Sequence, residues 1–510
     1  MKRDSVKSAL RFTAAMLTVL IISPLAASCG GDEALTDIDT EPEVTTDAYD
    51  GRTYSNEERL ALIDGAVLKL PSSFYDPDAK AEYFEKLNAI RDEYVEPGVI
   101  PDRAFWEFEQ AKAKLTVSYS GDYPVAVLNI PENLGKSYED GHIIVIDGGE
   151  VIESDVSVKV RGNSTASAEK KPYNVKFSEK VSLFGIEEGK KWSFLANFFD
   201  KTLIRNKLAL DFASKLELDY VSQSGFCEVW VNGKFVGNYL CCEPVSDGKN
   251  RVDVDTSKYD FILEVSPFGG WDFMTGAGVE LIYDSPEEPT EKQKKHLSEL
   301  LEKAEQAMKS GDIKQYSKYI DVDSFVDLYV MMELFKDVDG YWKSLYFYVK
   351  DDILYAGPPW DFDLTCGNVS TSYKEDNYYD YHNTHGHGDG SGDSTHGFRM
   401  VHGWWKILLG DEEFSSLVRE RYVDLQPLII NLFSDNELGQ NRIDLLVGAN
   451  ADSFAREYKQ NETEYNAGWD VNRCYSIYAG ESKGDYDDNI EFLRGWLEQR
   501  NDWLLENIGR

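Results

Sequence analysis

The chain has 510 residues, enough for two or three domains with a sizeable core, and its 13% aromatic content argues for a folded protein. Its formal net charge of -38, from 91 acidic and 53 basic residues, would repel nucleic acid and excludes it as a partner. Any nucleotide-binding site must therefore be a locally basic pocket, because the electrostatic field of the protein as a whole is negative.

Residues 1–28 have the pattern of a bacterial secretory signal, with lysines and arginines before an apolar run at 12–22. The end of this segment resembles a lipobox, in which Cys29 would become the lipidated first residue. A cleaved signal with a coincidental cysteine is the alternative. No later run is long and apolar enough to span a bilayer. We therefore expect an extracytoplasmic lipoprotein, anchored to the cell membrane through Cys29, with an acidic flexible tether over 29–70.

The next elements are predicted in chain order from hydrophobic spacing. A helical segment covers 71–114, and short alternating strands then follow at 115–119, 125–130, 142–146, 156–160 and 173–177. Residues 198–216 have helical spacing, Asn232-Gly233 predicts a strand hairpin, and 261–265 reads as a strand. Helices are expected at 290–309 and 321–336, a strand pair at 345–350 and 353–355, and mostly helices from 398. Strands first and helices later is an α+β order.

Five cysteines lie beyond Cys29, and no two of them are in CxxC spacing, which argues against a structural zinc site. Cys227 and Cys241 flank the predicted hairpin and could face each other, although buried free thiols fit the spacing equally well. The small, odd number does not indicate a disulfide framework.

Two acidic pairs stand about twenty residues apart, Asp337 with Asp339 and Asp361 with Asp363, joined by the predicted strand pair. Phosphoryl transfer to a protein needs one carboxylate to orient the attacking hydroxyl and another to hold magnesium. Asp-x-Asp pairs also cap turns in acidic proteins, so the spacing alone leaves both interpretations open.

Five blocks in order over about 115–430 resemble the spore-coat-protein-H (CotH) kinase family: 161–165 with 170–177, 192–207, 228–239, the Asp339 block, and Trp360-Asp361-Phe362-Asp363. The resemblance implies an atypical protein-kinase-like fold, with a mostly β N-terminal lobe and a helical C-terminal lobe. The kinase domain would cover 115–430, and 431–510 would extend it as helices. The implied reaction moves the γ-phosphate of ATP to Ser or Thr of extracytoplasmic or spore-coat-type proteins, using Mg²⁺ or Mn²⁺.

The resemblance also implies roles for single residues. Asp339 would orient the substrate hydroxyl and accept its proton, and Asp361 and Asp363 would hold the metal. The family usually has Asn five positions after the catalytic Asp, but this chain has Ser344, a weaker metal ligand. The change implies weaker metal binding, another residue in that role, or an inactive relative.

Phosphate contacts are expected from three bases, Arg161, Lys171 and Arg205, each of which could instead be a surface charge or a packing ion pair. Glu264 could pair with one of these bases or bind a second metal. The expected acceptor is a basic, Ser-rich protein, which the negative charge of the chain would attract.

Two other function classes remain open. A non-catalytic surface protein could use Ser344 and the aromatic residues to bind a protein or a polysaccharide; these aromatics are Tyr378, Tyr379, Tyr381, Trp404 and Trp405. A metal-dependent hydrolase could combine Asp361 and Asp363 with the histidines of a Gly/Asp/Ser-rich stretch, namely His382, His385, His387, His396 and His402. That stretch could equally be a solvated loop or a lid over the site.

Overall fold

The computed structural model describes residues 54–66, 68, 70, 74–115, 123–266, 270–338, 340, 343–369, 392–395, 403–458 and 483–509. Cys29, Asp339 and the five late histidines lie outside these residues, as do Tyr378, Tyr379 and Tyr381. Residues from Leu60 to Arg510 form one compact unit, and the architecture below is that of this unit.

Helices come first in the described chain, in agreement with the periodicity: α1 (Asn56–Asp64), α2 (Pro77–Ile90) with a π-turn (Arg91–Val95), and α3 (Asp102–Ala113). The Asp76 carboxylate caps α2 by accepting from the backbone N–H groups of Asp78 and Ala79. Tyr83 packs on Phe108 with ring centroids 5.5 Å apart, which joins α2 to α3. Helix α1 lies inside the 29–70 range, so the segment predicted to be a tether contains at least this helix.

Seven strands close into a barrel in the order β1-β2-β3-β4-β5-β7-β6. They are β1 (Val125–Asn129), β2 (Glu139–Asp147), β3 (Glu150–Val160), β4 (Tyr173–Leu183), β5 (Ile186–Leu195), β6 (Ser224–Val231) and β7 (Lys234–Cys242). Neighbouring strands are antiparallel except at the closure, where β1 and β6 run parallel from the pair Val125 and Glu228. Asn232 and Gly233 have φ of 49° and 78° and form the predicted β6–β7 hairpin.

A second sheet of five strands follows, in the order β12-β11-β8-β10-β9. It contains β8 (Phe261–Val265), β9 (Phe273–Met274), β10 (Glu280–Ser285), β11 (Tyr346–Lys350) and β12 (Ile353–Ala356). The β11–β12 hairpin matches the predicted strand pair, and β11 pairs with β8 so that Tyr346 lies opposite Glu264. The Trp360–Asp363 loop comes shortly after β12, the last strand of this sheet.

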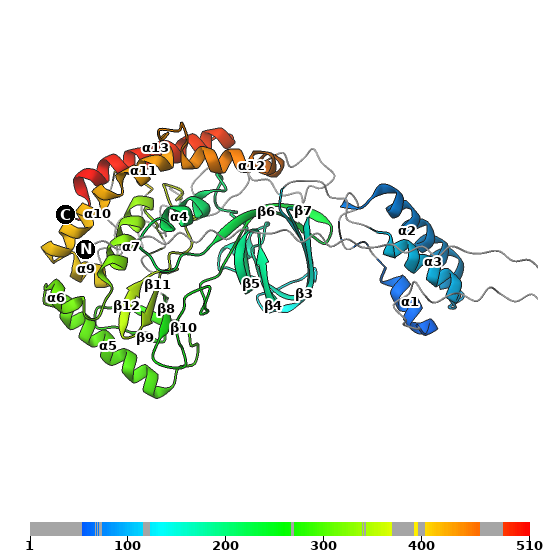
Figure 1. Ribbon diagram of the computed structural model, residues 1–510, viewed down its shortest axis with the longest axis horizontal. Coiled ribbons are helices and arrows are strands. Elements are labelled where there is room, and N and C mark those ends of the chain that lie inside the picture. The colour runs from blue at the N-terminus through cyan, green and yellow to red at the C-terminus, as the bar shows by residue number, and fades with distance from the viewer. Residues whose placement is uncertain are drawn as a thin grey trace, which may run out of the picture. The chain divides into compact units, whose positions relative to one another are not determined.

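Helices surround this second sheet: α4 (Arg205–Ala213), α5 (Glu291–Lys309), α6 (Ile313–Tyr316), α7 (Val322–Phe335), α9 (Gly403–Leu408), α10 (Glu412–Asp424), α11 (Gln426–Phe433), α12 (Arg442–Tyr458) and α13 (Tyr486–Asn507). Every residue of α7 from Ser324 to Phe335 is buried, so this helix is the centre of the C-terminal core. Helix α12 follows α11 and packs on β7 of the barrel. Figure 1 shows α12 and β7 side by side.

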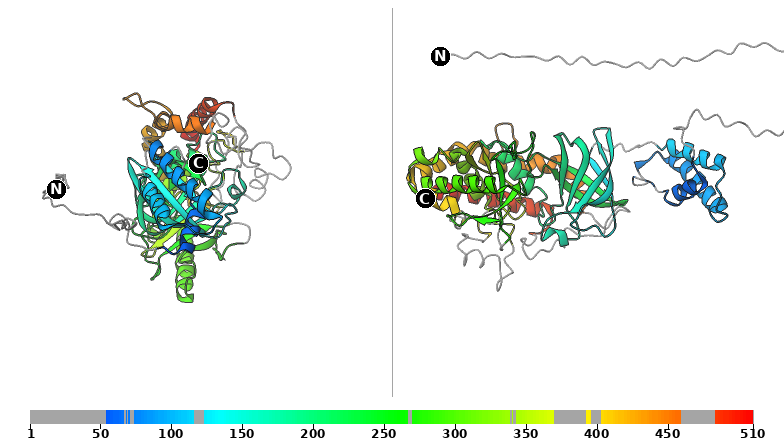
Figure 2. Two further views of the ribbon diagram at one scale, coloured as in Figure 1. Left: turned by 90° about the vertical axis from the view of Figure 1, so that its right-hand side faces the viewer. Right: turned by 90° about the horizontal axis from the view of Figure 1, so that it is seen from below.

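One hydrophobic core fills the barrel, and a larger one joins α4, the second sheet and the later helices. The right-hand view in Figure 2 shows the barrel strands beside these helices. The fold is therefore α+β, as expected from the element order.

Within the described residues, Cys227, Cys241, Cys242 and Cys366 are buried free thiols, so Cys227 and Cys241 form no disulfide.

Candidate functional site

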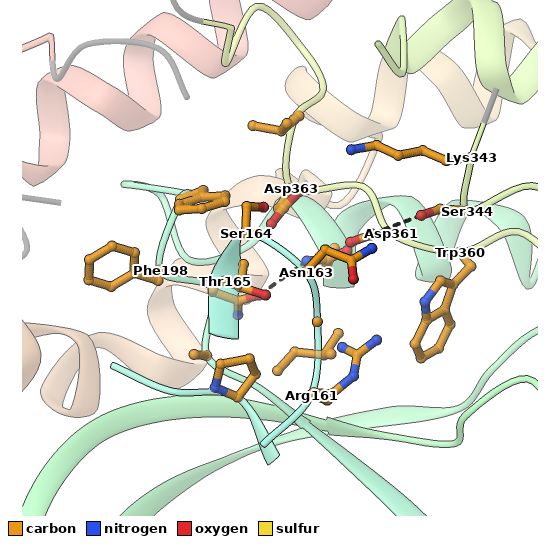
Figure 3. Close-up of a pocket in the computed structure, with 18 of the residues that line it drawn as sticks. Arg161, Asn163, Ser164, Thr165, Phe198, Lys343, Ser344, Trp360, Asp361 and Asp363 are labelled. Atoms are coloured by element: carbon orange, nitrogen blue, oxygen red, sulfur yellow. Dashed lines mark hydrogen bonds between the residues drawn. The ribbon is translucent and has the colours of Figure 1, made fainter. Parts of the chain in front are cut away.

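A cavity of about 170 Å³ lies where the loop after β3 meets the loop after β12. Its lining includes five predicted site residues, Arg161, Glu264, Ser344, Asp361 and Asp363. Figure 3 shows Asn163, Ser164 and Thr165 on the side that faces the two aspartates. Pockets for drug-sized ligands usually enclose ~300–1,000 Å³, so this cavity fits the phosphate end of a nucleotide better than a whole nucleotide.

Asp361 is held in a defined orientation. It has φ of 68° and Ser344 has φ of 55°, a left-handed conformation that persists in such residues only where the surroundings enforce it. The Ser344 hydroxyl donates to Asp361 Oδ2 at 3.1 Å, which Figure 3 draws as the dashed line between these two labelled residues. The next backbone N–H, of Phe362, donates to Asn206 Oδ1 at 2.7 Å, and Asn206 donates in turn to Asn197 Oδ1 at 3.2 Å.

Asp363 is fixed through its backbone. Its carbonyl oxygen accepts from Asn368 Nδ2 at 2.7 Å, and the same amide donates to the Phe199 carbonyl at 2.9 Å. Thr365 Oγ1 donates to the Phe362 carbonyl at 2.8 Å and closes the turn. Both carboxylates are therefore carried by a loop with few degrees of freedom, as a metal or phosphate site requires.

Glu264 lies at the side of the cavity formed by the second sheet. Burial raises its pKa to about 7, and the nearby Asp284 carboxylate adds to the rise, while a hydrogen bond with Tyr346 opposes it. Burial also raises the pKa of Asp284 to about 6. The cavity thus places a carboxyl that changes charge near neutral pH beside Arg161, the base expected to contact phosphate.

Arg161 is the base that the structure brings to the cavity. Its guanidinium carbon lies 5.4 Å from the centroid of the Trp360 ring, on the residue before Asp361. Lys343, which the sequence analysis did not single out, lines the cavity as well. The two side chains give the local positive charge that a phosphate needs inside this acidic protein.

The other two predicted bases lie elsewhere and have structural partners. Lys171 Nζ donates to the carbonyls of Ala166 and Ala168 at 3.0 and 3.2 Å, which braces the end of the loop after β3. Arg205 is buried, pairs with Asp200, and donates from Nε to the Thr365 carbonyl at 3.1 Å. Neither residue is among those that line the cavity.

Two aromatic residues proposed for sugar stacking are core residues. Trp404 is 1% exposed and donates from Nε1 to Glu305 Oε1, and Trp405 is 3% exposed and donates to the Phe325 carbonyl. Apolar spacing cannot distinguish a buried indole from an exposed one, so the expectation that these two rings stack on sugars is wrong.

The donor set suits a hard cation. Asp361 and Asp363 offer carboxylate oxygens and Ser344 a hydroxyl, and oxygen ligands are those that Mg²⁺ and Mn²⁺ prefer. Among the described residues, no group of three or more His, Cys, Asp or Glu side chains could hold a metal. Mg²⁺ typically binds through one or two carboxylates with water and substrate phosphates, so two aspartates are a donor set that fits this cation.

The family model for "CotH kinase protein" matches residues 158–504, which is more than half of the chain. The chain belongs to the CotH family. The match starts within β3, just before the Arg161 loop, and ends within α13, so it includes every residue that lines the cavity. The five sequence blocks thus predicted the family correctly.

One curated relative of this CotH-family chain is the inner spore coat protein H of Bacillus subtilis (strain 168). The two are 27% identical over 220 residues, which is 42% of this chain and 59% of the relative. In the described part of the chain, none of the helices has the length and apolar composition needed to cross a membrane.

Proposed function

We propose that this CotH-family protein is an atypical protein kinase that transfers the γ-phosphate of ATP to Ser or Thr hydroxyls of a partner protein. The observation that carries the proposal is the cavity in which Arg161 and Lys343 lie near Asp361 and Asp363. Phosphoryl transfer is catalysed mainly by positioning and by charge neutralisation, and this arrangement offers both. The barrel would act as the N-terminal lobe and the helical part as the C-terminal lobe.

Each residue has a specific task in this proposal. Asp361 and Asp363 would hold Mg²⁺ or Mn²⁺, which would neutralise charge on the ATP phosphates when bound. Arg161 would contact phosphate oxygens with its planar fork of N–H donors. Ser344 orients Asp361 through its hydrogen bond, which gives this position a use without the family's usual Asn. Asp339 would orient the acceptor hydroxyl.

The proposed setting follows from the first segment and from the relative. Cys29 would carry a lipid anchor, and the protein would act outside the cytoplasmic membrane or on a spore coat, as the name of the Bacillus relative suggests. A formal charge of -38 favours encounter with basic, Ser-rich acceptors. The alternative is a non-catalytic binding protein on the same fold, which would need no metal-dependent nucleotide binding.

The test is incorporation of label from γ-labelled ATP into a basic, Ser-rich protein by the purified chain, with Mg²⁺ or Mn²⁺. We expect Asp361→Asn to lower the rate by about 100-fold or more, because a neutral amide would hold the metal that neutralises the phosphate charge more weakly. Asp351→Asn is the matched control, since Asp351 also has positive φ, 51°, but lies in the β11–β12 turn. No labelling and no calorimetric ATP binding with either metal would leave the binding protein as the better interpretation.

A further inference from the structure

Residues 392–395 form a short segment near the candidate site, and three side chains donate hydrogen bonds to its backbone carbonyls. Lys336 Nζ donates to the Asp393 carbonyl at 2.7 Å, and Arg500 Nη1 donates to the Ser394 carbonyl at 3.0 Å. From α13, Trp496 Nε1 donates to the Gly392 carbonyl at 2.8 Å. We call residues 392–395 the anchor.

The anchor touches both segments that carry the acidic pairs. A Cβ on Gly392 would lie 3.1 Å from the Gly367 carbonyl oxygen, so the anchor backbone packs on the end of the Asp361–Asp363 loop. That loop is tied to the end of α7 because the Cys366 N–H donates to the Phe335 carbonyl at 2.8 Å. Lys336 is the next residue, and it leads into Asp337 and Asp339.

Lys336 has an unusual conformation. It is the C-cap of α7 with φ of 46° and ψ of 62°, left-handed values that glycine adopts most readily, and it is 1% exposed. A buried lysine in this conformation needs a partner that holds it, and the Asp393 carbonyl is one. The direction in which the chain leaves α7 toward Asp337 therefore depends on the anchor.

Arg500 joins the anchor to the same helix. It is fully buried, pairs with Glu333 Oε2 at 3.1 Å, and donates from Nε to the Glu333 carbonyl at 2.9 Å. Burying such a pair costs about as much free energy as its attraction returns, so stability is a weak explanation for it. Its three directed hydrogen bonds do specify one arrangement of α7, α13 and the anchor.

We infer that Lys336, Trp496 and Arg500 are positioning residues, which hold the anchor so that the chain leaves α7 through Asp337 and Val338 in one orientation. None of the three lines the cavity. The inference rests on the proposed kinase activity for its kinetic consequence, but its structural part can be measured without that activity.

The test compares Lys336→Met and Trp496→Phe with the control Trp405→Phe in the full chain. Trp405 is a buried indole that also donates to a backbone carbonyl, at 3.0 Å, but it lies away from the anchor. We expect the first two variants to lower kcat by about 10- to 100-fold with KM for ATP nearly unchanged, since small misplacements of catalytic groups cost this much. Trp405→Phe should leave kcat within about twofold, because it displaces none of those groups.

Two further measurements separate positioning from loss of folding. Melting temperatures should fall similarly in Trp496→Phe and Trp405→Phe, and hydrogen exchange in the peptide over 332–340 should accelerate only in Lys336→Met and Trp496→Phe. Unchanged exchange in that peptide, or kcat losses that follow melting temperature in all three variants, would overturn the inference. An inactive wild-type chain would refute the kinase proposal, while the exchange result would still decide whether the anchor holds this segment.

Discussion

At the residue scale, the raised pKa of Glu264 makes the stability of the protein depend on pH. Its carboxyl lies near Asp284 and Asp361, with Arg161 as the opposing charge. The folded-state pKa values of about 7 for Glu264 and about 6 for Asp284 lie above the usual 4.5 and 3.8. The folded protein therefore holds protons that the unfolded chain releases, and its stability falls as pH rises from about 4 to about 7.

Replacing Glu264 with Gln should remove part of this pH dependence. We expect Glu264→Gln to be more stable than the wild type at pH 8 by roughly 1–3 kcal/mol, with little difference at pH 4, because the neutral amide has no charge to desolvate. Urea unfolding at the two pH values measures the effect. Glu132→Gln, at an exposed position between β1 and β2, is the control. An unchanged pH dependence in Glu264→Gln would show that this carboxyl does not carry the proton.

At the scale of elements, the conformation of the loop that follows β3 depends on one glycine, Gly162. Gly162 has φ of 81°, and a Cβ there would lie 2.1 Å from Thr165 Oγ1, so the loop closes on itself where it faces the aspartates. Figure 3 shows Thr165 together with Asn163 and Ser164 at this wall. The loop would therefore occupy the place of a phosphate-binding loop without a run of glycines.

Gly162→Ala should displace Thr165 and weaken nucleotide binding. The control is Gly185→Ala in the β4–β5 turn, where φ is 74° but no atom lies within 4 Å of the added Cβ. Both variants should lose about 1 kcal/mol of stability from the left-handed backbone. Only Gly162→Ala should weaken ATP binding by about tenfold or more in calorimetry, an effect of about 1.4 kcal/mol. Equal affinities in the two variants would contradict a phosphate-contacting loop.

Local patterns predicted the local elements well. Asn232-Gly233 forms its hairpin, and the 290–309 and 321–336 patterns correspond to α5 and α7. The helical pattern of 198–216 yields only α4 (Arg205–Ala213), because the Asp200 side chain accepts from the Thr202 and Arg205 N–H groups and forms a turn before it. Closure of the barrel was not predictable, since alternation does not identify a partner strand so far along the chain.

The same limit applies to the site. Arg161 and Arg205 both lie in blocks that resemble the family, but only the fold places one at the cavity and the other on Asp200. Asn163, Asn206 and Lys343 were missed because neutral amides and single lysines carry little sequence signal. Asp339 and Cys29 lie outside the described residues, and their roles stay predictions.

At the scale of the whole molecule, a buried ion pair joins the barrel to the later helices. Lys170, just before β4, places Nζ 2.6 Å from Glu457 Oε1 on α12, and both side chains are fully buried. Glu457 also accepts from the Asn238 N–H on β7 at 2.6 Å. The pair fixes α12 against the barrel next to the end of the loop after β3, which lines the cavity.

Lys170→Met should destabilise the protein by about 3–5 kcal/mol, because it leaves the Glu457 charge buried without its partner. Lys171→Met is the control: its amine lies on two backbone carbonyls and is only partly buried, so about 1 kcal/mol is expected. Urea unfolding measures both, and Lys170→Met with Glu457→Met together should recover part of the loss. Similar losses in the two lysine variants would show that the pair is not the main link.

The parallel pairing of β1 with β6 also determines when this protein can fold. Val125 pairs with Glu228, 103 positions later, so the barrel can close only after most of its chain is available. Before β6 and β7 arrive, β1 and β5 present open edges that another chain could pair with. Contacts so distant in sequence are slow to form. A chain that emerges N-terminus first therefore has an aggregation-prone period that ends when β6 reaches β1.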